Sequence, residues 1–190
     1  MLDFELVREK KIALQKLVKG FTKADLQREL NEMYDEVSRL IANCKDVHVT
    51  FEPIDEKADD PYAVKGEETI SWTLGHVIVH LTASMEESAS IASELARGVE
   101  YHGRSRWEVP WQEVTTIEFC RARMAESRRM CLASLEMWPE PPHMDNTFTP
   151  AYPGALPHTC ISRFASGLKH ASDHLGQIAD IVHQARNSKS

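Results

Sequence analysis

Residues 71–97 read SWTLGHVIVHLTASMEESASIASELAR, and this stretch decides the fold class. Its apolar side chains recur at steps of three and four residues, which is the spacing of one face of an α-helix. The apolar positions are Leu74, Val77, Ile78, Leu81, Met85, Ala92 and Leu95. Ser71 can act as N-cap and Gly98 follows the last apolar turn, so the sequence predicts one long helix over residues 71–97.

Three further segments have the same periodicity and predict long helices. They cover residues 23–43, 116–138 and 159–186. Thr22 can cap the first of them, and Thr115 with Glu118 fits a capping box at the start of the second. The sequence therefore predicts an all-α protein built as a four-helix bundle.

The segments between these helices are long and rich in proline and glycine, which interrupt regular structure. They cover residues 52–70, 98–110 and 138–158. Connections of this length are more often functional than idle. Residues 4–18 predict a shorter preceding helix, and residues 46–52 alternate briefly in polarity, which favours a short strand but no sheet.

The chain has 190 residues and a formal net charge of −7, from 22 Lys and Arg against 29 Asp and Glu. This length suits one domain over residues 1–190. An acidic chain lacks the basic surface that binding to nucleic-acid backbones requires. The sequence contains no run of about 18 apolar residues, so it predicts no membrane-spanning helix. The first residues, MLDFELVREKK, lack the pattern of a signal peptide, so we expect a cytoplasmic protein.

The placement of the histidines carries the functional argument. His76 and His80 are four residues apart on one predicted helix, and His170 and His174 are four apart on another. Such a pair lies on one helix face and can present two imidazoles to one metal ion. On a helical wheel His80 and His174 border the apolar stripes and His170 lies a little further round, and at such a border a cleft can stay open to water. A single histidine there ordinarily only hydrogen-bonds a neighbour, so the indication of a metal site comes from the two pairs together.

Two of these segments resemble a known family. Residues 72–84, WTLGHVIVHLTAS, resemble the motif W-[ST]-x-x-x-[VI]-[VI]-x-H-L-x-x-[SA] of the DinB/YfiT-like superfamily, and residues 170–178, HASDHLGQI, resemble its motif H-x-x-x-H-x-x-Q-[IL]. The resemblance implies an antiparallel four-helix bundle, often dimeric. It also implies a divalent-metal site made by His80, His170 and His174.

The family includes metal-dependent transferases and isomerases that use a low-molecular-weight thiol such as bacillithiol, mycothiol or glutathione. The resemblance therefore implies a transferase that joins such a thiol to an electrophilic small-molecule substrate. The expected cofactor is a divalent transition metal, first zinc or nickel and then iron or manganese, with the thiol as co-substrate. The expected partner is a second copy of the chain. The sequence assigns no catalytic residues.

Two alternatives use the same histidines. A metal-dependent hydrolase would activate a water molecule, and Glu87, on the flank of His80, is one candidate general base. A stress-response protein that binds metal or ligand without catalysis could add a fourth protein ligand, for which His76, His143 and His158 are candidates. Gln177, one turn beyond His174, could orient a ligand.

Overall fold

The structure is a computed structural model that describes residues 1–56, 58–60 and 65–188. Within these residues the fold is helical, and the only β-type pairing is an isolated bridge between Phe148 and His158. The prediction of an all-α bundle is confirmed. The helices in chain order are α1 (Glu5–Arg8), α2 (Leu14–Leu17), α3 (Lys23–Ile41), α4 (Asp46–Val49), α5 (Leu74–Ala96), the 3₁₀ helix η1 (Trp111–Glu113), α6 (Ile117–Glu136), α7 (Cys160–Asp173) and α8 (Leu175–Asn187).

A threonine begins each of the long helices α3, α5, α6 and α7. Its hydroxyl accepts a hydrogen bond from a backbone N–H in the first turn, which satisfies a donor that the helix leaves free. Thr22 is the N-cap of α3, as predicted, and it forms a capping box with Asp25. Ser71 and Thr115 are corrected, because Thr73 caps α5 and Thr116 caps α6. Each true cap lies one or two residues later, where the backbone leaves the extended conformation.

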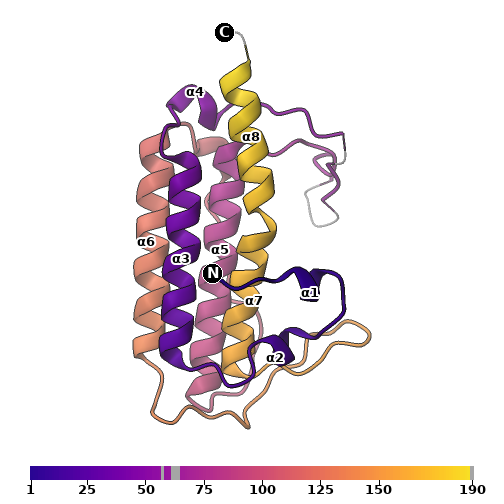
Figure 1. Ribbon diagram of the computed structural model, residues 1–190, viewed down its shortest axis with the longest axis vertical. Coiled ribbons are helices and arrows are strands. Elements are labelled where there is room, and N and C mark those ends of the chain that lie inside the picture. Colours follow the sequence, from indigo (N-terminus) through magenta and orange to yellow (C-terminus); the bar gives the residue numbers. More distant parts are fainter. Residues whose placement is uncertain (57, 61–64, 189–190) are drawn as a thin grey trace.

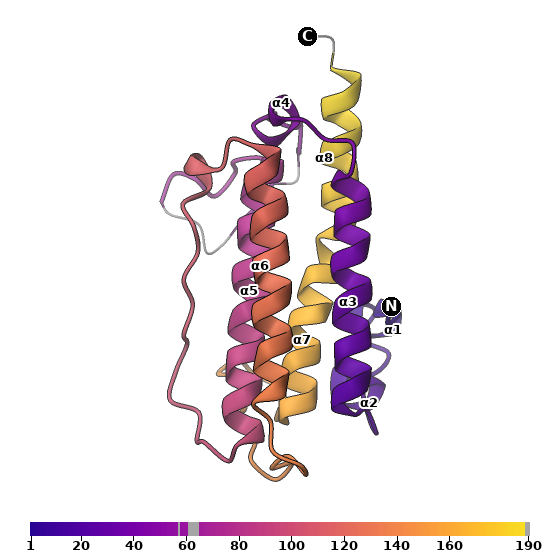
Figure 2. The ribbon, with the colours of Figure 1, turned by 90° about the vertical axis from the view of Figure 1, so that its left-hand side faces the viewer.

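The four long helical columns lie side by side, with α7 and α8 forming one column (Figure 1). α3 and the α7–α8 column run one way along the bundle, whereas α5 and α6 both run the other way. Because α5 and α6 are parallel, the chain must return along the whole bundle between them. Figure 2 shows residues 97–116 as an extended connection along this edge.

The core lies around α5. This helix is buried on several faces, and not on one face only as in an amphipathic surface helix, because neighbouring helices cover it. α7 approaches it closely at Gly167. A Cβ atom at Gly167 would lie 2.6 Å from the Ser88 Cβ atom and 2.9 Å from the Met85 sulfur. The absence of a side chain at this position therefore sets the distance between the two helices that carry the histidines.

Two further local predictions need correction. The short strand predicted over residues 46–52 is wrong, because Asp46–Val49 is helix α4. The Asp46 carboxylate accepts a hydrogen bond of 2.8 Å from the backbone N–H of Ile117, and Val49 is fully buried. The shorter helix predicted over residues 4–18 is instead two turns, α1 and α2, separated where Lys10 adopts a φ of 58°.

The predicted last helix is interrupted at His174. This residue ends α7 and begins α8, and its backbone N–H bonds to the carbonyl of Ala171 instead of the carbonyl one turn back. The two segments still follow one another closely (Figure 1). None of the described helices is both long enough and apolar enough to cross a bilayer.

Candidate metal centre

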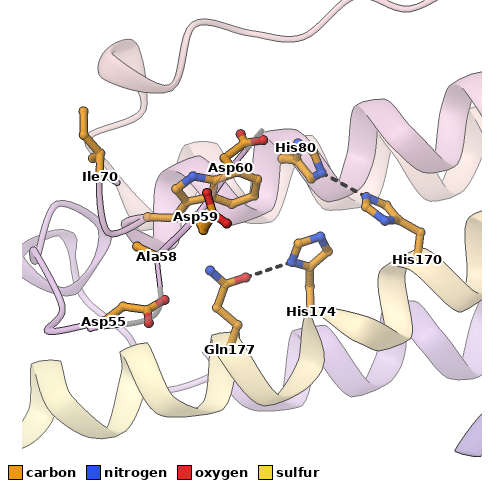
Figure 3. Close-up of a pocket in the computed structure, with 10 residues that line it drawn as sticks. Asp55, Ala58, Asp59, Asp60, Ile70, His80, His170, His174 and Gln177 are labelled. Carbon is orange, nitrogen blue, oxygen red and sulfur yellow. Dashed lines mark hydrogen bonds between the residues drawn. The ribbon is translucent and has the colours of Figure 1, made fainter. Parts of the chain in front are cut away.

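The structure brings His80 of α5 together with His170 and His174 from the last helical column. One ring nitrogen from each of the three residues lies within 4.8 Å of the others. The Nε2 atoms of His80 and His170 are 2.9 Å apart, and the His174 ring centroid is 5.2 Å from that of His80 (Figure 3). The i, i+4 spacing and the close approach of α5 and α7 together make this cluster.

The environment keeps these imidazoles neutral. Burial lowers the pKa of His80 to about 2 and that of His170 to about 4, and in both cases the neighbouring histidines add to the effect. Burial also lowers the pKa of His174, against a hydrogen bond to Gln177 that raises it. A metal requires the neutral imidazole as ligand, so no proton has to leave these rings at neutral pH.

Gln177 fixes the orientation of His174. The Nδ1–H of His174 donates a hydrogen bond of 2.8 Å to the side-chain oxygen of Gln177 (Figure 3). With its proton on Nδ1, the ring must leave the lone pair on Nε2 for a ligand. The predicted role of Gln177 in orienting a ligand thus has a direct geometric basis.

The donor set fits a divalent transition metal. Two nitrogen ligands of a tetrahedral zinc ion, at about 2.0–2.1 Å each, lie roughly 3.4 Å apart. The three histidine nitrogens lie within 4.8 Å of one another and the two Nε2 atoms of His80 and His170 are 2.9 Å apart, so the observed separations bracket that spacing. Three imidazoles also leave a coordination position for an exchangeable ligand, as catalytic sites require.

Two cavities border the cluster. One, of about 350 Å³, includes His174, Gln177, Asp55 and Asp59 in its wall. The other, of about 630 Å³, includes Arg104, Arg106, Glu108 and Trp111. Both cavities share the side chains of Asp60, Ile70, Trp72, His80 and His170. The histidine cluster therefore lies where two spaces meet.

His76 lies beside the cluster but not in it. Its ring is stacked between Trp72 and Trp111, at centroid distances of 4.3 Å and 5.0 Å. Its Nδ1 atom is buried and has no hydrogen-bond partner within the described part of the chain. Burial lowers the pKa of His76 to about 4, so the ring is neutral and acts as the middle layer of an aromatic wall.

The remaining candidate residues lie elsewhere. The Glu87 carboxylate is buried and accepts two hydrogen bonds of 2.7 Å from Arg104, which is unsuitable for a general base. The backbone N–H of His143 donates a hydrogen bond of 2.9 Å to the carbonyl of Ala96, the last residue of α5, and thus lies at the other end of this helix from His76. His158 pairs with Phe148 before α7 begins. None of these three belongs to the described histidine cluster.

Sequence reasoning missed Arg106 and Glu108. The Arg106 guanidinium lies 3.4 Å from His80 Nδ1 and forms a very short ion pair with Glu108, whose carboxylate is 3.7 Å from the same nitrogen. These residues lie in a connection without periodicity, where no pattern gives side-chain direction. The signal available was the charge density of residues 104–108 in an unusually long loop.

Comparison with known proteins agrees with the motifs. The sequence model of the DinB superfamily matches residues 12–178, which include the whole of α3, α5, α6 and α7 and the first turn of α8. No curated protein and no solved structure matches the chain.

Proposed function

The chain belongs to the DinB superfamily, and from that premise we propose that His80, His170 and His174 bind a divalent transition metal in a thiol transferase. The proposal is that the protein joins a low-molecular-weight thiol to an electrophilic small molecule. The observation that carries it is the convergence of three neutral imidazoles from two helical columns at the junction of two cavities.

A divalent metal at this site supplies a Lewis acid that keeps a coordinated thiol in its nucleophilic, deprotonated form at neutral pH. The protein has to provide neutral donor nitrogens, a fixed ring orientation and space for two reactants. The lowered pKa values of the histidines meet the first requirement, and Gln177 meets the second for His174.

The two cavities meet the third requirement. Because both share His80, His170 and Trp72, one reactant can approach the histidine nitrogens from the side of Gln177 and the other from the side of Trp111. Trp72 lies 4.7 Å from His80 and 5.8 Å from His174 by ring centroids, so its ring packs against the cluster and lines both cavities.

The first experiment is metal analysis of tag-free protein by mass spectrometry, beside a variant with His80→Ala, His170→Ala and His174→Ala. We expect about one transition metal per chain in the wild type, as for a three-histidine site, and none in the variant. The metal found is then used in conjugation assays with glutathione, bacillithiol and mycothiol against a panel of epoxides, activated alkenes and haloaromatics.

The outcomes separate the alternatives. Metal-dependent loss of free thiol supports the transferase. Hydrolysis of esters or amides by the metal-loaded protein, without thiol consumption, supports the hydrolase and rejects the transferase. Tight metal binding with neither reaction supports a non-catalytic ligand-binding protein. The homodimer stays a prediction, which light scattering checks on the same preparation.

A further inference from the structure

The connection between α5 and α6 contacts α5 in a regular register. Arg104 donates two hydrogen bonds of 2.7 Å to Glu87, and Arg106 donates one of 2.7 Å to the Ser84 hydroxyl. The Glu108 carboxylate follows at 3.7 Å from His80 Nδ1. Alternate residues of the connection thus meet successive turns of α5, in the antiparallel direction (Figure 2).

Simple geometry accounts for this register. Alternate side chains of an extended chain point to the same side, and four residues advance about 13 Å at 3.3 Å per residue. On α5, the positions i, i+4 and i+7 share a face and span about 10.5 Å at 1.5 Å per residue. The two repeats are close enough to match over three contacts. The intervening Trp107 is 74% exposed, as expected for a side chain that points away from α5.

The contacts of Arg104 and Arg106 with α5 hold Glu108 in place beside His80. Glu87 is only 4% exposed and also lies 3.8 Å from Arg106, so both arginines are held by one buried carboxylate. Arg106 in turn pairs with Glu108. The carboxylate of Glu108 is therefore not a mobile surface group but is fixed next to His80.

The Nδ1 atom of His80 lies between a donor, Arg106, and an acceptor, Glu108. The Nε2 atoms of His80 and His170 are 2.9 Å apart, so one of the two donates to the other, and the His80 proton can lie on either of its ring nitrogens. When Nε2 binds a metal, the neutral ring must carry its proton on Nδ1. Arg106 has only donors, so Glu108 is then the group beside Nδ1 that can accept it.

We propose that Glu108 is a positioning residue of the metal centre, which accepts the Nδ1 proton of His80 and holds this ring with Nε2 toward the metal. The connection of residues 97–116 is then part of the site and not only a link between helices. In the metal-bound protein Glu108 would take the role at His80 that Gln177 has at His174, with a charged acceptor that has to close in from 3.7 Å. This inference rests on the proposed metal site.

The test measures zinc affinity by competition with a chromophoric chelator for the wild type, Glu108→Ala and Glu108→Gln. Removing the acceptor of a metal-bound histidine typically costs 10–100-fold in affinity, so we expect that loss in Glu108→Ala. Glu108→Gln keeps an acceptor oxygen and should show a smaller loss. The matched control is Glu100→Gln, an exposed carboxylate on the same connection near the far end of α5.

A second measurement separates positioning from general destabilisation. In the zinc-loaded wild type, nitrogen-15 NMR of labelled histidine should show a protected, downfield Nδ1 proton for His80. The signal should move upfield in Glu108→Gln, and the thermal midpoint of the metal-free Glu108→Gln protein should stay near that of the wild type.

The results distinguish a failure of the role of Glu108 from a failure of the metal site itself. If the wild type binds zinc and Glu108→Ala binds it equally well, only the role of Glu108 is overturned. An affinity loss in Glu108→Gln without any change in the His80 signal assigns Glu108 to the framework and overturns the role as well. If the wild type binds none of zinc, nickel, iron and manganese, both the proposed function and this inference are rejected.

Discussion

The Nε2 atoms of His80 and His170 lie 2.9 Å apart, although 90 positions separate the two residues in the sequence. α5 and α7 carry them, and these helices approach closely at Gly167, one turn before His170. A contact between two side-chain nitrogens thus depends on a glycine that takes no part in it. This dependence can be tested through stability and through metal binding.

Gly167→Ala should destabilise the metal-free protein by about 1–3 kcal/mol, because the added methyl group enters a packed interface. Its Cβ atom would lie 2.6 Å from that of Ser88. Urea unfolding in the presence of chelator measures the change. Gly176→Ala is the matched control, since nothing lies within 4 Å of its added Cβ atom. An equal loss of stability in both variants would refute the role assigned to Gly167.

Substitution of His170 and of His76 should affect metal binding differently. We expect His170→Ala to lose bound metal, whereas His76→Gln keeps it because the His76 ring is held between Trp72 and Trp111. A ligand at 100 times its dissociation constant stabilises the folded state by about 2.7 kcal/mol. The thermal midpoint of the wild type should therefore rise with added zinc, and that of His170→Ala should not. Loss of metal in His76→Gln would instead support a fourth protein ligand.

Gln177→Ala should weaken zinc binding by roughly tenfold or more, because His174 loses the acceptor that fixes its Nδ1 proton. Isothermal titration with zinc measures the dissociation constant. Gln27→Ala provides the control, since that amide bonds only to Glu136 at the surface among the contacts described. Unchanged affinity in Gln177→Ala would show that packing alone orients His174.

The ion pair between Glu87 and Arg104 should make stability depend on acid pH. Burial raises the pKa of Glu87, but the hydrogen bonds and charges of Arg104 and then the charge of Arg106 lower it more, so the folded-state pKa lies below the ordinary 4.5. The unfolded state then takes up the proton first as the pH falls. The stabilisation is present above pH 4.5 and is lost as the pH falls through the folded-state pKa.

Glu87→Gln should therefore unfold more easily than the wild type at pH 7, by about 1–3 kcal/mol from the broken charged hydrogen bonds. The difference should shrink below pH 4.5, which urea unfolding at several pH values measures. Glu126→Gln removes an exposed pair with Arg129 and should change stability much less. A constant difference between Glu87→Gln and the wild type across this range would contradict the prediction.

The long helices and the histidine pairs on two of them could be predicted from the sequence, because both depend on residues close together in the chain. The apolar period of residues 71–97 predicts α5, and Thr22 caps α3 as expected. The i, i+4 spacing places each histidine pair on one helix face. The family motifs then select the same three histidines that the structure brings together.

Local patterns were insufficient wherever a distant segment supplied the partner. The alternation over residues 46–52 indicates a strand, but Asp46 instead meets the start of α6, and the turn is helical. Glu87 has the position of a possible base on the helical wheel, yet Arg104 from the connection occupies its carboxylate.

The sequence by itself determined which segments are helical and which residue types face one another at one-turn spacing, because backbone hydrogen bonding and amphipathic periodicity act within a few residues. Only the tertiary structure decided that α5 and α6 run in the same direction and that the chain between them lies along α5. The position of Glu108 beside His80 follows from that path. An extended connection has no periodicity of its own, so its side chains take their directions from the helix on which they pack.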